Sequence, residues 1–193
     1  IKIPVPSTSE KDEWGDYHFA KSLRKEIRKY GHSVRIDVIP DWSCPDSLED
    51  DIVIVLRGLT EYEPLPDKVN IIWNISHPDK ISDKEYEKYD HVFVASLEYS
   101  KQLQKRLKVP VSPLLQCTDP SVFFPEKSEE TRKASTLLFV GNSRKIFRKS
   151  VKYSVERGED ISVYGTRWND LIPAEYLKGE HIPNKLLHSY YGN

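Results

Sequence analysis

Residues 137–149 read Leu-Leu-Phe-Val-Gly-Asn-Ser-Arg-Lys-Ile-Phe-Arg-Lys, and they indicate the fold more strongly than any other stretch. The apolar run that ends at Gly141 predicts a central strand of a parallel sheet. Asn142 and Ser143 are typical N-cap residues, so a helix is predicted over residues 144–157. The free N–H groups and the dipole of a helix start favour an anion. The stretch indicates either a phosphate-binding turn or an ordinary strand–turn–helix unit with a solvated basic face.

Strands and helices alternate along the part of the chain that precedes this stretch. Short apolar runs predict strands at residues 1–5, 34–39, 52–56, 69–73, 91–95 and 111–115. Apolar residues at helical spacing predict helices at residues 16–30, 82–89 and 98–107. Because such alternation favours parallel strands joined by right-handed crossovers, the predicted fold class is α/β with a Rossmann-like parallel sheet.

The alternation breaks between Cys117 and Ala134, where prolines and then a run of charges are typical of a linker. We therefore predict a first domain at residues 1–117, a linker at 118–134 and the beginning of a second Rossmann-like domain at 135–193. The second part offers only two predicted strands, followed by a loop and a final helix, at residues 136–140, 161–164, 165–179 and 184–191. Because two strands hardly close a core, we expect the natural chain to continue, or a second copy to cover the open edge by self-association.

The composition describes a globular chain with no strong electric field of its own. The 193 residues carry 29 Lys and Arg against 30 Asp and Glu, so the net charge is −1. A charge near zero argues against non-specific binding to nucleic acid or to an anionic membrane. Cys44 and Cys117 lie far apart, which favours reduced thiols. No signal peptide and no apolar run of roughly 18 residues is recognisable, so we predict a cytoplasmic protein without a transmembrane segment.

Several catalytic motifs are absent from the sequence. No Gly-x-Gly pair, no Gly-x-x-x-x-Gly-Lys phosphate loop and no Gly-x-Ser-x-Gly elbow occurs. The six histidines show no His-Glu-x-x-His spacing, so no metal site is predicted. The absence of Asp-x-Asp weighs against a metal-dependent glycosyltransferase of the single-sheet type.

Four segments of the chain resemble a known family. They read Trp-Gly-Asp-Tyr-His-Phe-Ala at residues 14–20, Trp-Asn-Ile-Ser-His-Pro-Asp at 73–79, Leu-Gln-Cys-Thr-Asp-Pro at 115–120 with Phe-Pro at 124–125, and Phe-Val-Gly-Asn-Ser-Arg at 139–144. Together they look like bacterial group 1 glycosyltransferases of the spore-maturation-like branch, and the resemblance covers essentially the whole chain. Such proteins are associated with transfer to cell-surface polysaccharides and glycans.

The resemblance implies a GT-B architecture, in which the second Rossmann-like domain mainly holds a nucleotide-sugar donor and the first mainly holds a glycan acceptor. The implied reaction is metal-independent transfer of a hexosyl-type sugar. It uses the nucleotide-sugar as co-substrate and no cofactor, because a helix dipole and basic side chains can stabilise the departing diphosphate. The family normally continues with further strands and an acidic, glycine-bearing donor motif. This chain stops before them, so the resemblance implies a truncated enzyme that is inactive alone.

Two residues are the candidate catalytic groups. His77 follows the predicted strand at residues 69–73. There a neutral imidazole could accept a proton or bind a sugar hydroxyl, or else the residue could simply shape the turn before Pro78. Asp79 could fix that imidazole or cap the next turn. Asp16 could deprotonate an acceptor hydroxyl, or it could serve as a helix N-cap.

The candidate donor ligands lie in glycine-containing turns. The predicted phosphate-binding residues are Gly15, Gly141, Asn142, Ser143, Arg144 and Lys149. The predicted nucleoside-binding residues are Gly165, Thr166, His181 and Ile182. Arg144 is placed first among the phosphate ligands because it follows the glycine turn directly. Trp168 could stack on a ring or belong to the core, and Arg57 could reach a phosphate or pair with Glu61.

Two other classes of protein share this organisation. A non-catalytic GT-B-like binding or scaffold protein could have the same fold, since a fold alone does not certify chemistry. A periplasmic-type solute-binding protein would also have two lobes. The sequence shows no signal peptide, however, and its predicted linker crosses only once between the lobes.

Overall fold

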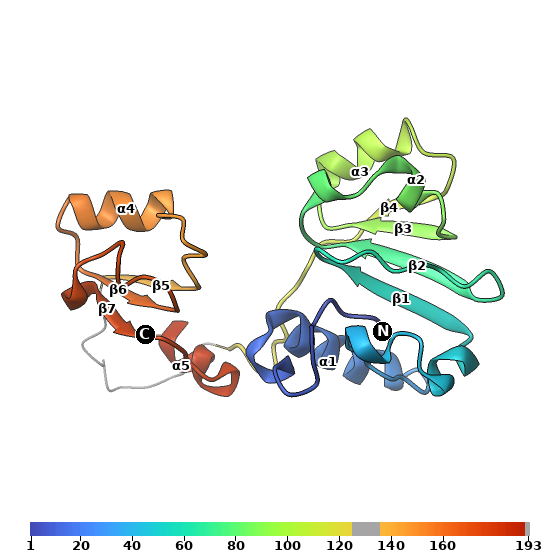
Figure 1. The fold of residues 1–193 in the computed structure, drawn as a ribbon, viewed down its shortest axis with the longest axis horizontal. Coiled ribbons are helices and arrows are strands. Elements are labelled where there is room, and N and C mark those ends of the chain that lie inside the picture. Colours follow the sequence, from blue (N-terminus) through green and yellow to red (C-terminus); the bar gives the residue numbers. More distant parts are fainter. Residues whose placement is uncertain (125–135, 192–193) are drawn as a thin grey trace. The chain divides into compact units, whose positions relative to one another are not determined.

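The computed structural model of the chain describes residues 1–124 and 136–191 (Figure 1). The chain divides into two compact units, Ile1–Cys117 (unit 1) and Thr118–Asn193 (unit 2). Residues 125–134 of the predicted linker lie outside the described residues, as do residues 135, 192 and 193 of the predicted second domain.

Unit 1 contains a sheet of four parallel strands in the order β1-β2-β3-β4. The strands are β1 (Ile52–Arg57), β2 (Val69–Asn74), β3 (His91–Val94) and β4 (Val111–Pro113). One row of the register runs from Val55 through Ile72 and Val92 to Val111. This confirms the predicted α/β class with parallel pairing.

Two extended segments continue this sheet beyond β1 through isolated bridges. The amide of Lys2 donates to the carbonyl of Ile54 at 2.8 Å, and the amide of Leu56 donates back to Lys2 at 3.0 Å. On the other side, Lys2 bridges to Asp37. Segments 1–5 and 34–39 were predicted as full strands, but only single bridges form there. The spatial order is therefore 34–39, 1–5, β1, β2, β3, β4. From segment 1–5 the chain first adds segment 34–39 on one side and then β1 to β4 on the other, so the strand order reverses between segment 1–5 and β1.

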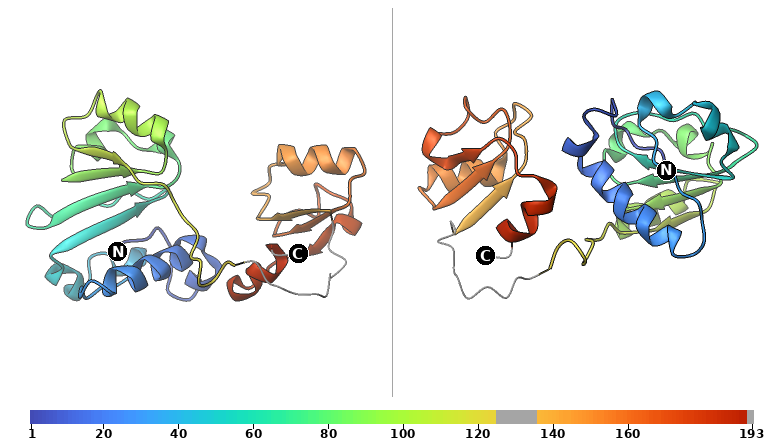
Figure 2. Two further views of the ribbon diagram at one scale, coloured as in Figure 1. Left: turned by 180° about the vertical axis from the view of Figure 1, so that it is seen from behind. Right: turned by 90° about the horizontal axis from the view of Figure 1, so that it is seen from below.

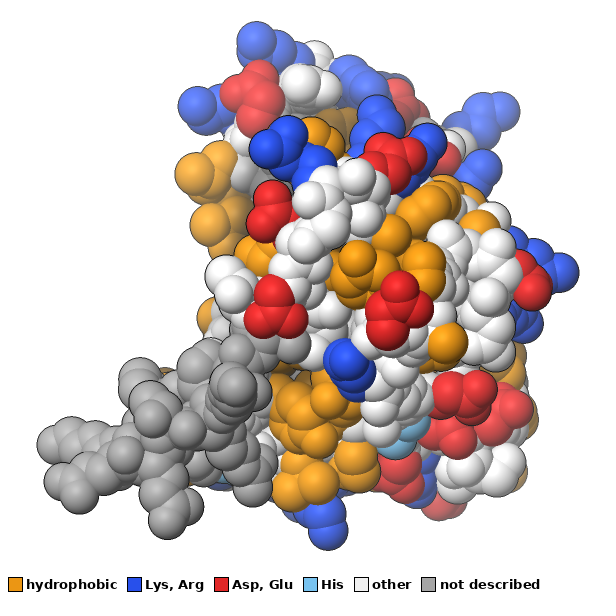
Figure 3. Space-filling model, turned by 90° about the vertical axis from the view of Figure 1, so that its left-hand side faces the viewer, with side chains coloured by type: hydrophobic (Ala, Val, Ile, Leu, Met, Phe, Trp, Pro, Cys, Tyr) orange, Lys and Arg blue, Asp and Glu red, His pale blue; other side chains and the backbone are white. Residues whose placement is uncertain are grey.

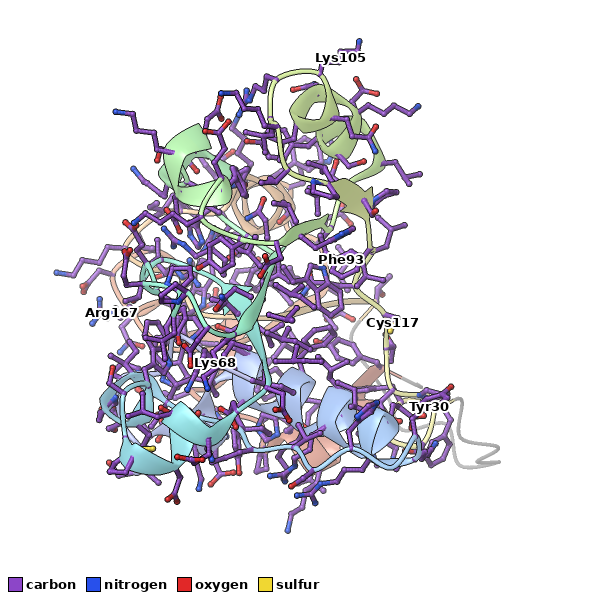
Figure 4. All side chains as sticks on the ribbon, turned by 90° about the vertical axis from the view of Figure 1, so that its right-hand side faces the viewer. Tyr30, Lys68, Phe93, Lys105, Cys117 and Arg167 are labelled. Atoms are coloured by element: carbon purple, nitrogen blue, oxygen red, sulfur yellow. The ribbon has the colours of Figure 1, made fainter. Side chains whose placement is uncertain are left out.

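Helices cover both faces of the sheet of unit 1 (Figures 1 and 2). They are α1 (Gly15–Arg28), α2 (Asp83–Tyr86) and α3 (Leu97–Gln104). On one face, Ala20 of α1 packs with Leu56 and Trp73, and Phe93 of β3 adjoins this cluster (Figure 4). On the opposite face, the core contains Val55 and Ile72 of the sheet with Tyr86 of α2 and Leu103 of α3. The strands β1 and β2 thus bury side chains on both faces of the sheet, as the apolar runs in their sequences predict.

The described residues also include six short 3₁₀ helices, four in unit 1 and two in unit 2. They are Lys11–Glu13, Ile39–Asp41, Pro45–Glu49, Pro78–Lys80, Ala174–Tyr176 and Asn184–Leu186. Ser82 and Ser96 cap α2 and α3, because their hydroxyls accept hydrogen bonds from the amides of Glu85 and Tyr99.

A buried ion pair fixes the carboxyl end of β1. Nε and Nη2 of Arg57 donate to the two carboxylate oxygens of Glu85 in α2, at 2.5 and 3.1 Å. The same guanidinium also donates to the carbonyls of Gly58, at 2.6 Å, and Lys80, at 3.3 Å. Both side chains are almost fully buried, and the guanidinium ties the end of β1 to α2 and to the 3₁₀ helix at Pro78–Lys80.

Unit 2 contains three parallel strands in the order β5-β6-β7. They are β5 (Leu137–Val140), β6 (Ile161–Tyr164) and β7 (Leu177–Gly179), accompanied by α4 (Lys149–Glu156) and α5 (Leu187–Tyr191). Val151, Val163 and the fully buried Trp168 lie in its core, so Trp168 belongs to the core and is not presented for stacking. The prediction of only two strands was wrong. β7 is three residues long and too short to show a period of its own.

Two predicted helix starts differ from the structure. α4 begins at Lys149, not at residue 144, because Arg144 and Lys145 adopt left-handed backbone conformations with φ of 55° and 62°. Asp16 is not an N-cap. α1 begins at Gly15, and Asp16 lies in its first turn, where a carboxylate still favours the helix dipole.

Replacing Glu85 by Ala should lower the free energy of unfolding of unit 1 by about 3–5 kcal/mol, because a buried guanidinium loses its counter-charge. Urea unfolding followed by circular dichroism measures this change. The control is Glu61→Ala, which removes an exposed partner of Lys88 at 3.1 Å and should cost less than about 1 kcal/mol. Equal costs for the two variants would contradict the role assigned to the Arg57 pair.

Candidate functional site

The loops that follow the strands carry most of the residues predicted to bind or react. In a parallel sheet these loops share one edge, the carboxyl edge, where open α/β sheets bind ligands. Each unit therefore has one candidate site, and the two are described separately.

In unit 1, three loops converge closely at the carboxyl edge. A Cβ added to Gly58, which follows β1, would lie 2.8 Å from Cγ of Pro4 and 4.0 Å from Oγ of Ser76. Pro4 belongs to the first extended segment, and Ser76 follows β2. The site therefore lies at the point where the strand order reverses, the usual ligand position in such folds.

His77 is held in an unusual conformation at this edge. Its backbone is left-handed, with φ of 50°, and its ring atom Nδ1 lies 2.9 Å from Oγ of Ser76. Nδ2 of Asn74, at the end of β2, donates to the carbonyl of Ser76 at 2.7 Å. A left-handed non-glycine residue is strained, and such strain gathers at functional sites. The second ring atom, Nε2, forms no hydrogen bond with the described residues.

Two neighbours of His77 do not play the roles that the sequence suggested. Asp79 is exposed, and its carboxylate lies 3.6 Å from Nζ of Lys80, while Ser76 holds the imidazole. Arg57 pairs with Glu85 instead of Glu61, and it is too deeply buried to reach a phosphate.

The start of α1 offers open space beside its backbone. A Cβ added to Gly15 would meet no atom within 4 Å, so packing does not require a glycine there. Trp14, which precedes it, is 38% exposed, and Asp16, which follows it, is partly buried. The catalytic role of Asp16 and the phosphate-binding role of Gly15 stay predictions.

In unit 2, the loops after β5 and β6 touch each other through their backbones. A Cβ added to Gly165 would lie 2.2 Å from the carbonyl oxygen of Gly141, and Gly165 also has a φ of 145°. Only glycine fits there. Nε1 of the buried Trp168 donates to the same carbonyl at 2.8 Å, and this hydrogen bond holds the Gly141 carbonyl from the core side.

Polar side chains join these two loops further. Oδ1 of Asn142 accepts a hydrogen bond from the amide of Thr166 at 2.8 Å, and the amide of Ser143 donates to the carbonyl of Thr166 at 3.1 Å. The Ser143 hydroxyl donates to the carbonyl of Arg167 and accepts from the amide of Lys145. Neither Asn142 nor Ser143 caps a helix, so that prediction was wrong. The structure nevertheless brings together two predicted sets of donor residues: the phosphate-binding Gly141, Asn142 and Ser143, and the nucleoside-binding Gly165 and Thr166.

Basic side chains surround this double loop. Arg144, Lys145, Lys149 and Arg167 are exposed, and among the residues that the structure describes they form no ion pair. Arg167, labelled in Figure 4, lies on the loop that follows β6. Arg167 was not among the residues predicted to bind a ligand, although its position two residues after Gly165 was a usable signal.

The two remaining predicted nucleoside ligands lie after β7. The carbonyl of Gly179, the last residue of β7, accepts a hydrogen bond from the amide of Gly165 at 2.9 Å, so this third loop begins beside the other two. His181 is exposed, whereas the side chain of Ile182 is only 6% exposed. A ligand at this loop would therefore meet the backbone of Ile182 and not its side chain.

The described surface carries both signs of charge. On the face shown in Figure 3, Lys and Arg side chains alternate with Asp and Glu, and several hydrophobic side chains are exposed between them. Within residues 1–124 and 136–191, no three His, Cys, Asp or Glu side chains gather as a metal site. No described helix combines the length and the apolar character that a membrane crossing needs.

No protein-family model matches the chain, and no curated protein sequence matches it at a significant level. A function for the chain must therefore be inferred from its own residues.

Replacing Gly165 by Ala should lower the free energy of unfolding of unit 2 by more than about 3 kcal/mol, because the new Cβ would overlap the Gly141 carbonyl. Gly158→Ala is the matched control. Gly158 also has a positive φ, 67°, but open space around it, so backbone strain alone should cost about 1–2 kcal/mol. Thermal unfolding monitored by the amide signals of β5 and β6 separates the two cases. A Gly165 variant as stable as the control would show that the loops can part.

Proposed function

We propose that the chain belongs to a GT-B glycosyltransferase that transfers a hexosyl-type sugar from a nucleotide-sugar to a cell-surface glycan. One observation carries the proposal. The four segments that resemble group 1 glycosyltransferases are residues 14–20, 73–79, 115–125 and 139–144. Two of them span the ends of β2 and β5, one follows β4, and one covers the start of α1. The resemblance therefore includes the loops at the carboxyl edges, where parallel sheets bind ligands, together with core residues such as Ala20 and Trp73.

In unit 1, His77 is suited to act on an acceptor hydroxyl. An imidazole whose Nδ1–H donates to Ser76 carries its lone pair on Nε2, which is the atom needed to accept a proton. The left-handed backbone and the hydrogen bond from Asn74 to the Ser76 carbonyl fix the direction of the ring. We assign the acceptor side of the reaction to this edge, with Asp16 as the second candidate base.

In unit 2, the glycine contact and the exposed cations are suited to a nucleoside diphosphate. Glycines allow a phosphate to approach the backbone, and cationic side chains stabilise the negative charge that develops on the leaving diphosphate. Such stabilisation requires no metal ion. We assign the donor side of the reaction to this edge.

Incubating the full-length natural protein with UDP-, GDP- and ADP-sugars and measuring released nucleoside diphosphate tests the proposal. Release from one of the three donors, accelerated by a glycan acceptor, is the expected result. Saturable nucleotide binding without release would favour the non-catalytic binding protein. Neither binding nor release would contradict both.

Replacing His77 by Asn should lower turnover by about 10²–10⁴-fold and change donor affinity little, because Asn tolerates the left-handed backbone but cannot act as the base. Initial rates at saturating donor and calorimetric donor affinity measure the two effects. His32→Asn, an exposed histidine of unit 1, serves as the control and should leave both unchanged. Equal losses in turnover and donor affinity would indicate a structural role for His77.

Replacing Gly15 by Ala should leave the free energy of unfolding unchanged or raise it by up to about 1 kcal/mol, since the new methyl group meets no atom and lies in a helix. If a ligand approaches the Gly15 backbone, the same variant should lose turnover without losing stability. Paired unfolding and rate measurements decide this. Unchanged turnover would remove Gly15 from the site.

A further inference from the structure

A pocket of about 490 Å³ lies beside the double loop of unit 2. Its lining residues come from both loops and are Lys145, Arg167, Asn169, Asp170 and Leu171. Neither Arg144 nor Lys149, the two cations that the sequence placed at the phosphate, lines it. The pocket is large enough for a small ligand of the size of a sugar phosphate.

The two cationic residues of the pocket share an uncommon backbone state. Lys145 and Arg167 are both left-handed, with φ of 62° and 63°. A non-glycine residue keeps this conformation only where the surroundings impose it. Here a single buried hydroxyl does so, because Oγ of Ser143 donates to the carbonyl of Arg167 and accepts from the amide of Lys145 at 3.1 Å. One side chain thus fixes the backbone beneath both cations.

The charges of the pocket lack partners within the protein. In the part of the chain that the structure describes, neither Lys145 nor Arg167 forms an ion pair, not even with Asp170 in the same pocket. Two cations from separate loops suit the oxygens of a phosphoryl group. The Asp170 carboxylate repels a bare anion and, with the Asn169 carbonyl, accepts hydrogen bonds from hydroxyl groups. These cationic and acceptor side chains together favour a ligand that carries both a phosphoryl group and hydroxyl groups.

We propose that this pocket binds a phosphoryl group attached to a hydroxylated ring. Lys145 and Arg167 hold the phosphoryl oxygens, and Asn169 and Asp170 accept from ring hydroxyls. The inference rests on the proposed function in one respect, since a nucleotide-sugar is a source of such a ligand. The phosphate ligands are then Lys145 and Arg167, and not Arg144 and Lys149, which were predicted from the sequence. Binding of the ligand itself requires no sugar transfer.

Titration of the full chain with three probes, followed by calorimetry and by amide NMR shifts, tests the proposal. The probes are UDP, glucose 1-phosphate and inorganic phosphate. Either ring-bearing probe should bind at least about tenfold more tightly than phosphate, and the tighter of the two identifies the source of the ligand. Shifts should centre on residues 143–145 and 166–171.

Lys145→Asn and Arg167→Asn should each weaken binding of the better probe by about tenfold or more, while the left-handed backbone is kept because Asn tolerates it. Asp170→Asn should tighten inorganic phosphate and reduce the preference for the ring-bearing probes. Lys152→Asn, which alters an exposed lysine of α4 that pairs with Glu156, is the control and should bind as the parent does. Circular dichroism confirms folding of each variant.

Three results would overturn the proposal: absence of saturable binding by any probe, equal losses in the control variant, or a loss confined to Arg144→Asn. Loss of pocket binding in the Lys145 and Arg167 variants, together with absent sugar transfer by the full-length natural protein, would support the pocket and contradict the glycosyltransferase activity. Sugar transfer that persists undiminished in both variants would contradict the pocket and support the glycosyltransferase activity.

Discussion

Parallel pairing is the constraint on which the rest of this structure depends. Two parallel neighbours cannot be joined by a tight turn, so every connection must cross back over a face of the sheet. In both units some of these connections contain helices that pack on the sheet, and the loops that follow the strands gather at one edge. Residues distant in sequence, such as Gly58 and Ser76 or Gly141 and Gly165, become neighbours because they lie just beyond paired strand ends.

Charge is treated differently in the interior and at these edges. Arg57 and Glu85 are both buried and neutralise each other at hydrogen-bond distance. Lys2 of the first extended segment and Asp37 are also both buried, and their charged groups lie 2.7 Å apart. At the carboxyl edge of unit 2, by contrast, exposed cations stand on a rigid double loop with no ion-pair partner among the described residues. Because the buried charges are paired and these exposed cations are not, the cations favour binding of an external anion.

Local pattern was enough to predict the strands that are continuous and apolar. β1 and β5 were found because uninterrupted runs of Ile, Val, Leu and Phe have few other uses in a globular chain. The features that were not predicted depend on contacts between residues distant in sequence. The start of α4 depends on a hydroxyl bonded to a carbonyl 24 residues away, and the partner of Arg57 lies 28 residues along the chain. Of the candidate site, the glycine turns were predictable, whereas Arg167 was not selected because its importance comes from the pocket.

The Ser143 hydroxyl also determines how this edge can move. Because it bonds the backbones of both loops, neither loop can leave its conformation without breaking the bonds of the other. The two loops therefore behave as one cooperative opening unit, with a single free energy shared by the amides of Ser143, Lys145 and Thr166. Fluctuations of the edge are then concerted: the cations are presented together or withdrawn together, and a ligand that meets one of them meets both.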